Sequence, residues 1–239
     1  MTLGKETLQI ATFGVEALGY SPADSYIITC EQYVQNAGVN KNLSMWCAKT
    51  GKTLAQFEWR KSPQESMKSI IFTPDEKLCL RLVPHRAASK EPNQIEIYKD
   101  GDFSKPEICI KARFQQKAPV KGDPPIMVDS KFDGFELCPL NPQVPADQSP
   151  LYLFAWNNAA MMTEEETNGS VYVYDLKGET FEKSKFMIQC HQGQDIQVKP
   201  STTGHAVLVW SQNFHDTSGK SYYGQHSLQY VQIFGGRDR

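Results

Sequence analysis

Short stretches of alternating apolar and polar residues, broken by glycine turns, recur along this chain. Residues 43–57 (LSMWCAKTGKTLAQF) show the unit, because the two-residue alternation before Gly51 is typical of a β-strand and a second strand follows the turn. Residues 95–103 (IEIYKDGDF) and 171–181 (VYVYDLKGETF) repeat this shape, with turns at Gly101 and Gly178. The pattern therefore predicts three β-hairpins.

A second landmark, a strand that ends in a proline turn, precedes each hairpin. Pro22 and Pro74 close two such strands and lie 52 residues apart, which is also the spacing between Trp46 and Tyr98. Two independent landmarks with one period indicate an internal repeat. Looser copies end at Pro139 and Pro200, at spacings stretched by the proline-rich loops 117–125 and 139–150. In the second copy we expect the strands starting at Ser69, Leu78 and Ile95 to share a sheet, with Ile71 and Leu80 pointing into the core.

Each copy contains a strand, a proline turn, a strand, a loop, a strand, a glycine turn and a strand. Four antiparallel strands in about 40–50 residues are typical of a WD-type β-propeller blade. A sandwich or closed barrel would not predict the recurring proline. We therefore predict an all-β, WD40-like propeller domain over residues 1–239. Its four blades span residues 13–59, 67–112, 124–188 and 194–235, and residues 1–12 end a preceding blade.

The ends of the chain allow two arrangements. Residues 7–11 form a predicted outermost strand without a blade of its own, and the last blade lacks a fourth strand after the strand at 228–233. The first strand could complete the last blade and close the ring, as in WD propellers. We expect instead an open arc of a larger propeller, in which residues 7–11 do not pair with residues 228–233.

Composition excludes several classes of protein. The formal net charge of -2 gives no overall basic field for nucleic acid or membrane, although a local basic face is compatible with it. No apolar run reaches the roughly 18 residues of a membrane helix, and because the first ten residues contain no apolar core segment, we expect no secretory signal. Six cysteines without a C-x-x-C pair do not indicate a zinc site or disulfides, and those at 47, 79 and 109 lie in apolar strands. We expect a cytoplasmic protein.

Two segments imitate part of a phosphate-binding loop. Gly51-Lys52-Thr53 and Gly219-Lys220-Ser221 lack the earlier glycine that this loop needs, since Trp46 and Phe214 occupy its place. Strands rather than helices follow both segments, which indicates ordinary turns. The five histidines are too scattered for a metal triad. We therefore expect no enzyme, no catalytic residue, no metal or other cofactor and no small-molecule substrate.

Two groups of residues are candidates for contact with RNA. Lys220, Tyr222 and Tyr223 combine a cation with aromatic rings in a loop, a pairing that binds phosphate and stacks on bases. The alternative is that these tyrosines pack between blades. A basic surface is expected at the cations of a second segment, Lys111, Arg113, Lys117 and Lys121.

Residues 206–231 (AVLVWSQNFHDTSGKSYYGQHSLQYV), with their Ser-Tyr-Tyr-Gly signature and the following Leu-x-Tyr strand, resemble the family of eukaryotic translation initiation factor 2A. This is the single-chain factor, not a subunit of initiation factor 2. Residues 49–52, 75–79 and 93–95 resemble the corresponding blades. The resemblance implies part of a longer propeller that binds the small ribosomal subunit and favours delivery of initiator methionyl-tRNA, with other initiation factors as further partners. The alternative is a generic WD-repeat interaction scaffold similar to the propeller of initiation factor 3 subunit b.

Overall fold

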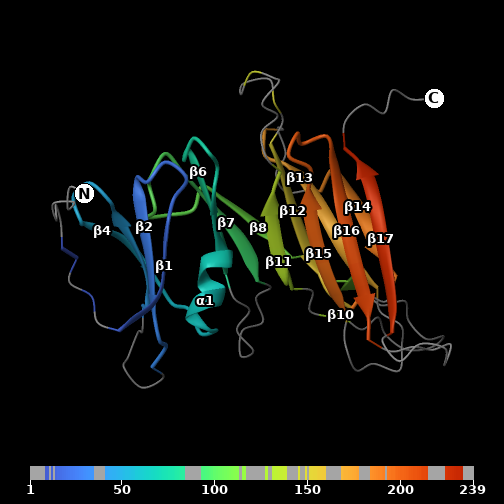
Figure 1. Ribbon diagram of the computed structural model, residues 1–239, viewed down its shortest axis with the longest axis horizontal. Helices are drawn as coiled ribbons and strands as arrows, with labels where there is room; N and C mark the ends of the chain where they lie inside the picture. The colour runs from blue at the N-terminus through green and yellow to red at the C-terminus, as the bar shows by residue number, and fades with distance from the viewer. Residues whose placement is uncertain are drawn as a thin grey trace, which may run out of the picture. The chain divides into compact units, whose positions relative to one another are not determined.

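A computed structural model describes most of the chain. The residues described are 9–10, 12, 14–34, 41–83, 93–112, 115–116, 127–128, 131–138, 145, 149, 151–159, 168–177, 184–191, 193–214 and 224–233. They form two compact units, one of Met1–Arg86 with Ile95–Cys109 and one of Ala87–Gln94 with Ile110–Arg239. Figure 1 shows that β-strands make up nearly all of the regular secondary structure described in both units.

The first unit contains one complete sheet and most of a second. The first sheet has the order β1 (Val15–Tyr20), β2 (Tyr26–Glu31), β3 (Leu43–Cys47) and β4 (Thr53–Phe57). A short helix α1 (Pro63–Ser66) and a 3-10 turn (Met67–Ser69) lead into the second sheet. Its order is β5 (Ile70–Phe72), β6 (Leu78–Val83), β7 (Gln94–Lys99) and β8 (Ile108–Lys111). The three predicted strands therefore share one sheet.

The second unit contains the remaining strands. The two-residue strands β9 (Gln115–Gln116) and β10 (Met127–Val128) pair with each other. A four-stranded sheet follows, with β11 (Gly134–Leu137), β12 (Tyr152–Asn157), β13 (Gly169–Asp175) and β14 (Phe186–Cys190) in chain order. The last sheet has β15 (Asp195–Pro200), β16 (Ala206–Asn213) and β17 (Gln225–Gln232). Within the described residues β17 pairs with β16 alone, so it forms an edge of this sheet (Figure 1).

A hydroxyl-capped turn explains the landmark that recurs in the sequence. The Ser21 Oγ accepts a hydrogen bond from the Tyr26 amide at 2.9 Å, and the Ser21 amide donates to the Tyr26 carbonyl. Thr73 makes the same pair of bonds with Leu78, and Ser201 makes it with Ala206. Each turn contains one residue with positive φ, namely Asp24, Glu76 or Gly204. A hydroxyl therefore caps this turn in three copies of the repeat, including the fourth copy, which has no proline after Ser201.

The hairpin turns agree with the prediction at two positions. Gly51 has a φ of +67° between β3 and β4, and Asp100 and Gly101 both have positive φ after β7, the geometry of a type I′ turn. The strand after Gly101 was predicted too early, because β8 begins only at Ile108. The Asp102 carboxylate caps the intervening bend by accepting bonds from Ser104, which delays the return of the chain to the sheet. Gly178 lies outside the described residues, and the strand that pairs with β13 begins at Phe186.

A hydrophobic cluster holds the two sheets of the first unit together. First-sheet residues in this cluster include Ile28, Cys30, Leu43 and Met45, and second-sheet residues include Ile70, Phe72, Cys79 and Tyr98. Tyr26 stacks on Phe72 with 5.4 Å between ring centroids and meets the edge of Phe103. The predicted core residue Leu80 is fully buried on the opposite side of the second sheet, and its partner Ile71 is half-buried.

The second unit has an equivalent cluster between its two larger sheets. Phe154, Val171 and Val173 of one sheet meet Ile196, Val198, Val207 and Val209 of the other. These side chains alternate along β12, β13, β15 and β16, so one face of each strand is apolar as the period of two requires. The prediction of an all-β chain is confirmed.

Several expectations need correction or fall outside the described residues. The short helix α1 was not predicted, although Pro63 at its start is a recognised opening residue. Cys109 is exposed and not a buried apolar residue, because the alternation along β8 directs Ile110 inward instead. In the proposed strand 7–11, only Gln9 and Ile10 are described, and neither is in a strand. The expectation about its pairing otherwise lies outside the described residues.

Candidate interaction surface

Most of the RNA-contact candidates fall outside the described residues. Lys220, Tyr222 and Tyr223 lie in the undescribed segment 215–223, and Arg113, Lys117 and Lys121 follow β8 in segments that are likewise not described. Lys111 is described, and its exposed side chain stands at the last position of β8. The structure thus makes Lys111 available to a partner, and the other six residues stay predictions.

The base of the loop 215–223 is described on both sides. Asn213 at the end of β16 pairs with Gln225 at the start of β17, so the loop leaves and re-enters the sheet at one place. Gly224 has a φ of +72°, and a Cβ atom there would overlap the Asn213 carbonyl oxygen. The glycine of the Ser-Tyr-Tyr-Gly signature is therefore required by the backbone, since no other residue fits at this position.

Aromatic side chains surround this loop base. Phe214 is about half exposed at 47%, and its amide donates a 2.8 Å hydrogen bond to the Gln194 Oε1. Trp210 stacks on His226 with 5.6 Å between ring centroids. Exposed rings beside a loop with a lysine and two tyrosines can stack on unpaired bases while the cation contacts phosphate. Sequence reasoning found the loop but not Phe214, Trp210 or His226, because their proximity depends on the pairing of β16 with β17.

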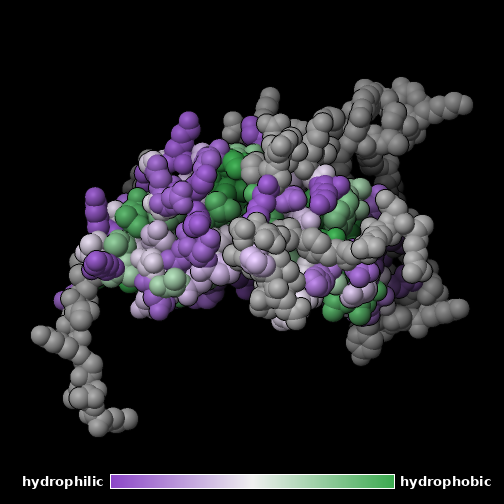
Figure 2. Space-filling model, turned by 90° about the horizontal axis from the view of Figure 1, so that it is seen from above, coloured by the Kyte–Doolittle hydropathy of each residue, from purple (hydrophilic) through white to green (hydrophobic). Residues whose placement is uncertain are grey.

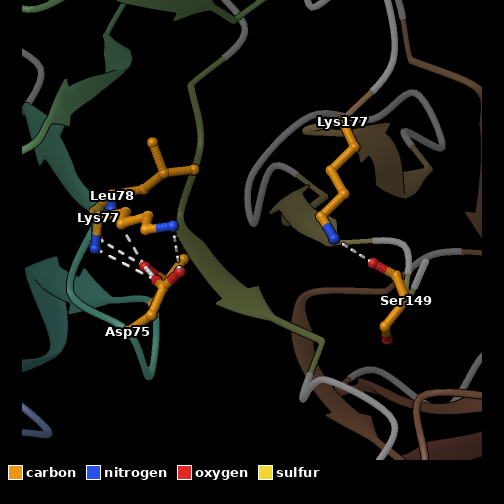
Figure 3. Close-up of polar contacts among 6 residues, drawn as sticks. Asp75, Lys77, Leu78, Ser149 and Lys177 are labelled. Atoms are coloured by element: carbon orange, nitrogen blue, oxygen red, sulfur yellow. Dashed lines mark hydrogen bonds and ion pairs between the residues drawn. The ribbon is translucent and has the colours of Figure 1, made fainter. Parts of the chain in front are cut away.

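The carboxylate of Glu76 is a buried charge that serves the fold. Its Oε1 accepts a 2.7 Å hydrogen bond from the Ala23 amide, so the turn of the second sheet caps the corresponding turn of the first. Burial alone would raise the pKa of Glu76, but hydrogen bonds from Ser21, Ser25 and the Ala23 amide outweigh burial and lower the pKa. The neighbouring Asp75 carboxylate accepts a bond from the Lys77 amide (Figure 3) and another from the Thr73 hydroxyl, both within its own turn.

A second buried charged cluster joins the two sheets of the first unit. The Arg81 guanidinium donates to the Glu96 Oε2 at 2.7 Å and 3.1 Å, and the Tyr98 hydroxyl donates to the same oxygen at 2.6 Å. The guanidinium lies over the ring of Phe57 from β4, 4.1 Å from its centroid. Burial, followed by the hydrogen bond to Glu96, raises the pKa of Tyr98. The three polar side chains bond to one another and the guanidinium packs on Phe57 of the first sheet, so the cluster serves as an inter-sheet tie.

Two asparagines, each just before the third strand of a sheet, make further long-range polar contacts. Asn42 exchanges hydrogen bonds with the backbone of Trp59, at 2.9 Å and 2.8 Å. Asn93, just before β7, makes the same two bonds with the backbone of Phe132, both at 2.8 Å. Asn93, the first residue of the segment 93–95, therefore has a structural role. In Figure 3 the Lys177 ammonium donates to the Ser149 carbonyl, another contact that fixes a loop.

Among the described residues, no group of three or more His, Cys, Asp or Glu could hold a metal ion. Burial raises the pKa of the Cys79 thiol to about 12 and those of Cys138 and Cys190 to about 11, so these thiols are protonated at neutral pH.

No helix in the described ranges has the length and apolar character needed to cross a membrane. Figure 2 shows hydrophobic residues reaching the surface between hydrophilic ones.

Comparison with known proteins identifies one curated relative and several structures. No protein-family model matches the chain. The chain is 25% identical over 237 residues to eukaryotic translation initiation factor 2A of Schizosaccharomyces pombe, covering 97% of this chain and 34% of that protein. A crystal structure described as the eukaryotic initiation factor matches with a TM-score of 0.64 at 19% identity, over 94% of this chain and 44% of the other. The Cps50 (Swd1) β-propeller domain of Myceliophteria thermophila matches with a TM-score of 0.33, at 10% identity over 95% and 74% of the two chains.

These comparisons support the sequence reading at two levels. The resemblance to eukaryotic translation initiation factor 2A is confirmed, and it extends along nearly the whole chain. The TM-score of 0.64, together with consecutive antiparallel sheets of up to four strands, confirms the WD-type β-propeller fold. The chain spans about a third of the length of the curated relative.

Proposed function

We propose that this chain is a translation initiation factor that acts as a non-enzymatic propeller scaffold in the cytoplasm. It binds the small ribosomal subunit and favours delivery of initiator methionyl-tRNA to it, with other initiation factors as further partners. The observation that supports this most is the resemblance to initiation factor 2A over 97% of the chain, joined to the match in fold with an initiation factor structure.

The proposed contacts come from two regions. Lys220, Tyr222 and Tyr223 would meet RNA from the loop whose base carries the exposed ring of Phe214. The second region starts at the exposed Lys111 and continues through the predicted contacts Arg113, Lys117 and Lys121. Lysine and arginine neutralise phosphates and release counterions, whereas tyrosine stacks on bases without regard to sequence. A chain with a net charge of -2 can bind RNA only through such local surfaces.

Co-sedimentation with purified small ribosomal subunits tests the proposal. We expect the chain to pellet with small subunits at about 50 mM salt and to be largely released at about 200 mM, because phosphate contacts weaken steeply with salt. Large subunits serve as the control and should retain little of the chain. Equal retention by both subunits, or no retention at low salt, would contradict the proposal.

Variants then assign the contact region. Lys220→Glu together with Tyr222→Ala should weaken binding roughly tenfold, since one lost stacking contact is worth about 1–3 kcal/mol. Lys68→Glu reverses an exposed lysine of the first unit and should leave binding unchanged. Wild-type binding by the loop variant would exclude the loop and leave the region from Lys111 to Lys121 as the candidate.

A generic interaction scaffold similar to the propeller of initiation factor 3 subunit b is the alternative. It would bind other initiation factors through a surface without a charge bias. Retention on small subunits that requires another initiation factor, and that does not depend on salt, would favour this alternative.

A further inference from the structure

Asn168 is the one asparagine in the sequence that is followed by glycine. It lies immediately before β13, whose first residue is Gly169. Such a pair is chemically labile, because glycine has no side chain to shield its backbone nitrogen from the neighbouring amide carbon. Asparagine is also one of the thermolabile residues. The contacts around both residues decide whether the fold protects this pair or promotes its reaction.

The fold requires glycine at position 169. A Cβ atom there would lie 2.5 Å from the Ile196 Cδ1 and 2.8 Å from the Gly193 carbonyl oxygen. The second contact is with backbone, which cannot move aside as a flexible side chain can. Ile196 also belongs to the hydrophobic cluster of this unit, and Gly169 pairs with Cys190 of β14. The small residue that makes the pair labile therefore cannot be exchanged without disturbing the packing.

A histidine side chain contacts the amide group of Asn168. The Asn168 Oδ1 lies 3.2 Å from the Nδ1 of His191, the residue that follows β14. An amide oxygen can only accept a hydrogen bond, so the imidazole N–H is the donor in this contact. A donor at Oδ1 stabilises the negative charge that develops on this oxygen when a nucleophile attacks Cγ. His191 is exposed and Asn168 is half-buried, so water reaches the pair.

We propose that Asn168 is a site of spontaneous deamidation, which the His191 imidazole promotes and in which water is the second reactant. The Gly169 backbone nitrogen gives its proton to solvent and attacks the Asn168 Cγ, while the imidazole N–H donates to Oδ1. The new N–Cγ bond closes a five-membered succinimide ring. The Cγ–Nδ2 bond breaks, and the Nδ2 group takes up a proton and leaves as ammonia. Water then opens the ring at either carbonyl carbon, which gives aspartate or isoaspartate, and no oxidant or reductant takes part.

Both products change the start of β13. Aspartate places a carboxylate beside His191, with which it forms an ion pair when the imidazole is protonated. Isoaspartate adds a methylene group to the main chain just before the pairs of Gly169 with Cys190 and Ser170 with Gln189. Because β13 is bonded to both β12 and β14, we expect this insertion to weaken the sheet. The inference concerns the lifetime of the folded chain and goes beyond the proposed function.

Peptide mass spectrometry of the folded full chain during incubation at neutral pH tests the proposal. Exchange of the amide for a carboxyl group raises the mass of the peptide that contains residue 168, and an isoaspartyl methyltransferase labels the isoaspartate product. We expect Asn168 to deamidate faster than every other asparagine of the chain. A folded chain in which Asn168 reacts no faster than the other asparagines would overturn the proposal.

Variants of His191 test the role of the imidazole. Folded His191→Ala should deamidate at Asn168 roughly tenfold more slowly, because it lacks the donor to the developing negative charge, which at an exposed site is worth less than in a buried oxyanion hole. His191→Gln keeps a side-chain N–H and should retain part of the rate. His205→Ala removes another exposed histidine of the same unit and should react like the wild type.

Incubation in urea separates the effect of the fold from that of the local sequence. The wild type and His191→Ala should deamidate at the same rate in urea, since the contact of His191 with Asn168 exists only in the folded chain. Circular dichroism without urea establishes that each variant is folded. Equal rates for the folded wild type and the folded His191→Ala variant, or a difference that persists in urea, would refute the role of the imidazole.

Discussion

Replacing Arg81 by methionine should destabilise the first unit by about 3–5 kcal/mol, because the substitution leaves the Glu96 carboxylate buried without its counterion. The side chains of Arg81 and Glu96 are only 10% and 12% exposed, so water replaces little of the lost interaction. The substitution also removes the guanidinium from the ring of Phe57, which links the two sheets. Urea unfolding followed by circular dichroism measures the change.

The double variant Arg81→Met/Glu96→Met separates the cost of the orphaned charge from the strength of the pair. It should be less destabilised than Arg81→Met alone, because a buried ion pair replaced by apolar residues is often close to neutral. The pair of Lys99 and Glu107 is the surface control: both side chains are 54% exposed, and Lys99→Met should change stability by less than about 1 kcal/mol. Equal losses at Arg81 and Lys99 would refute the assignment of a buried inter-sheet tie.

Glu76→Gln should destabilise the first unit by about 1–3 kcal/mol at pH 7, since an amide group faces the donors that now bond to the carboxylate. The folded-state pKa of Glu76 is lowered below its ordinary value of 4.5. A lowered pKa contributes stability that is fully present above the unfolded-state value and is lost as the pH falls through the folded value. The difference between wild type and variant should therefore shrink as the pH drops below about 4.5.

The measurement is the free energy of unfolding of both proteins at a series of pH values. Taking the difference removes the contribution of other carboxyls, such as Asp75 and Asp102, that titrate in both proteins. Glu65→Gln alters an exposed carboxyl and should give a small difference at every pH. A difference at Glu76 that grows on acidification would show that burial, and not hydrogen bonding, determines its pKa.

The repeat could be predicted from sequence because it rests on local chemistry. The hydroxyls of Ser21 and Thr73 cap their turns within five residues, so the motif and its structure coincide along the chain. Gly51 and Gly101 similarly mark turns whose backbone needs a positive φ. Prediction was less accurate where a bend interrupted a hairpin, as after Gly101, because a side-chain cap and not the apolar pattern sets where β8 begins.

Contacts between sheets could not be predicted from the sequence. Nothing in the sequence indicates that Glu76 reaches the Ala23 amide or that Arg81 lies over Phe57, since these residues are far apart in the chain. The candidate RNA-contact loop was likewise only partly predictable from the sequence. The loop with Tyr222 could be identified from its residue types, whereas the neighbouring aromatic rings depend on strand pairing. The need for glycine at 224 also follows only from the approach of the backbone at Asn213.

The most direct test of the central claim is retention of initiator methionyl-tRNA on purified small ribosomal subunits in the presence of this chain. Elongator methionyl-tRNA is the control, because it carries the same amino acid on a different tRNA. The proposed function predicts that the wild-type chain increases retention of the initiator tRNA at low salt and leaves that of the elongator tRNA unchanged. No increase for the initiator tRNA, or an equal increase for both, would contradict it.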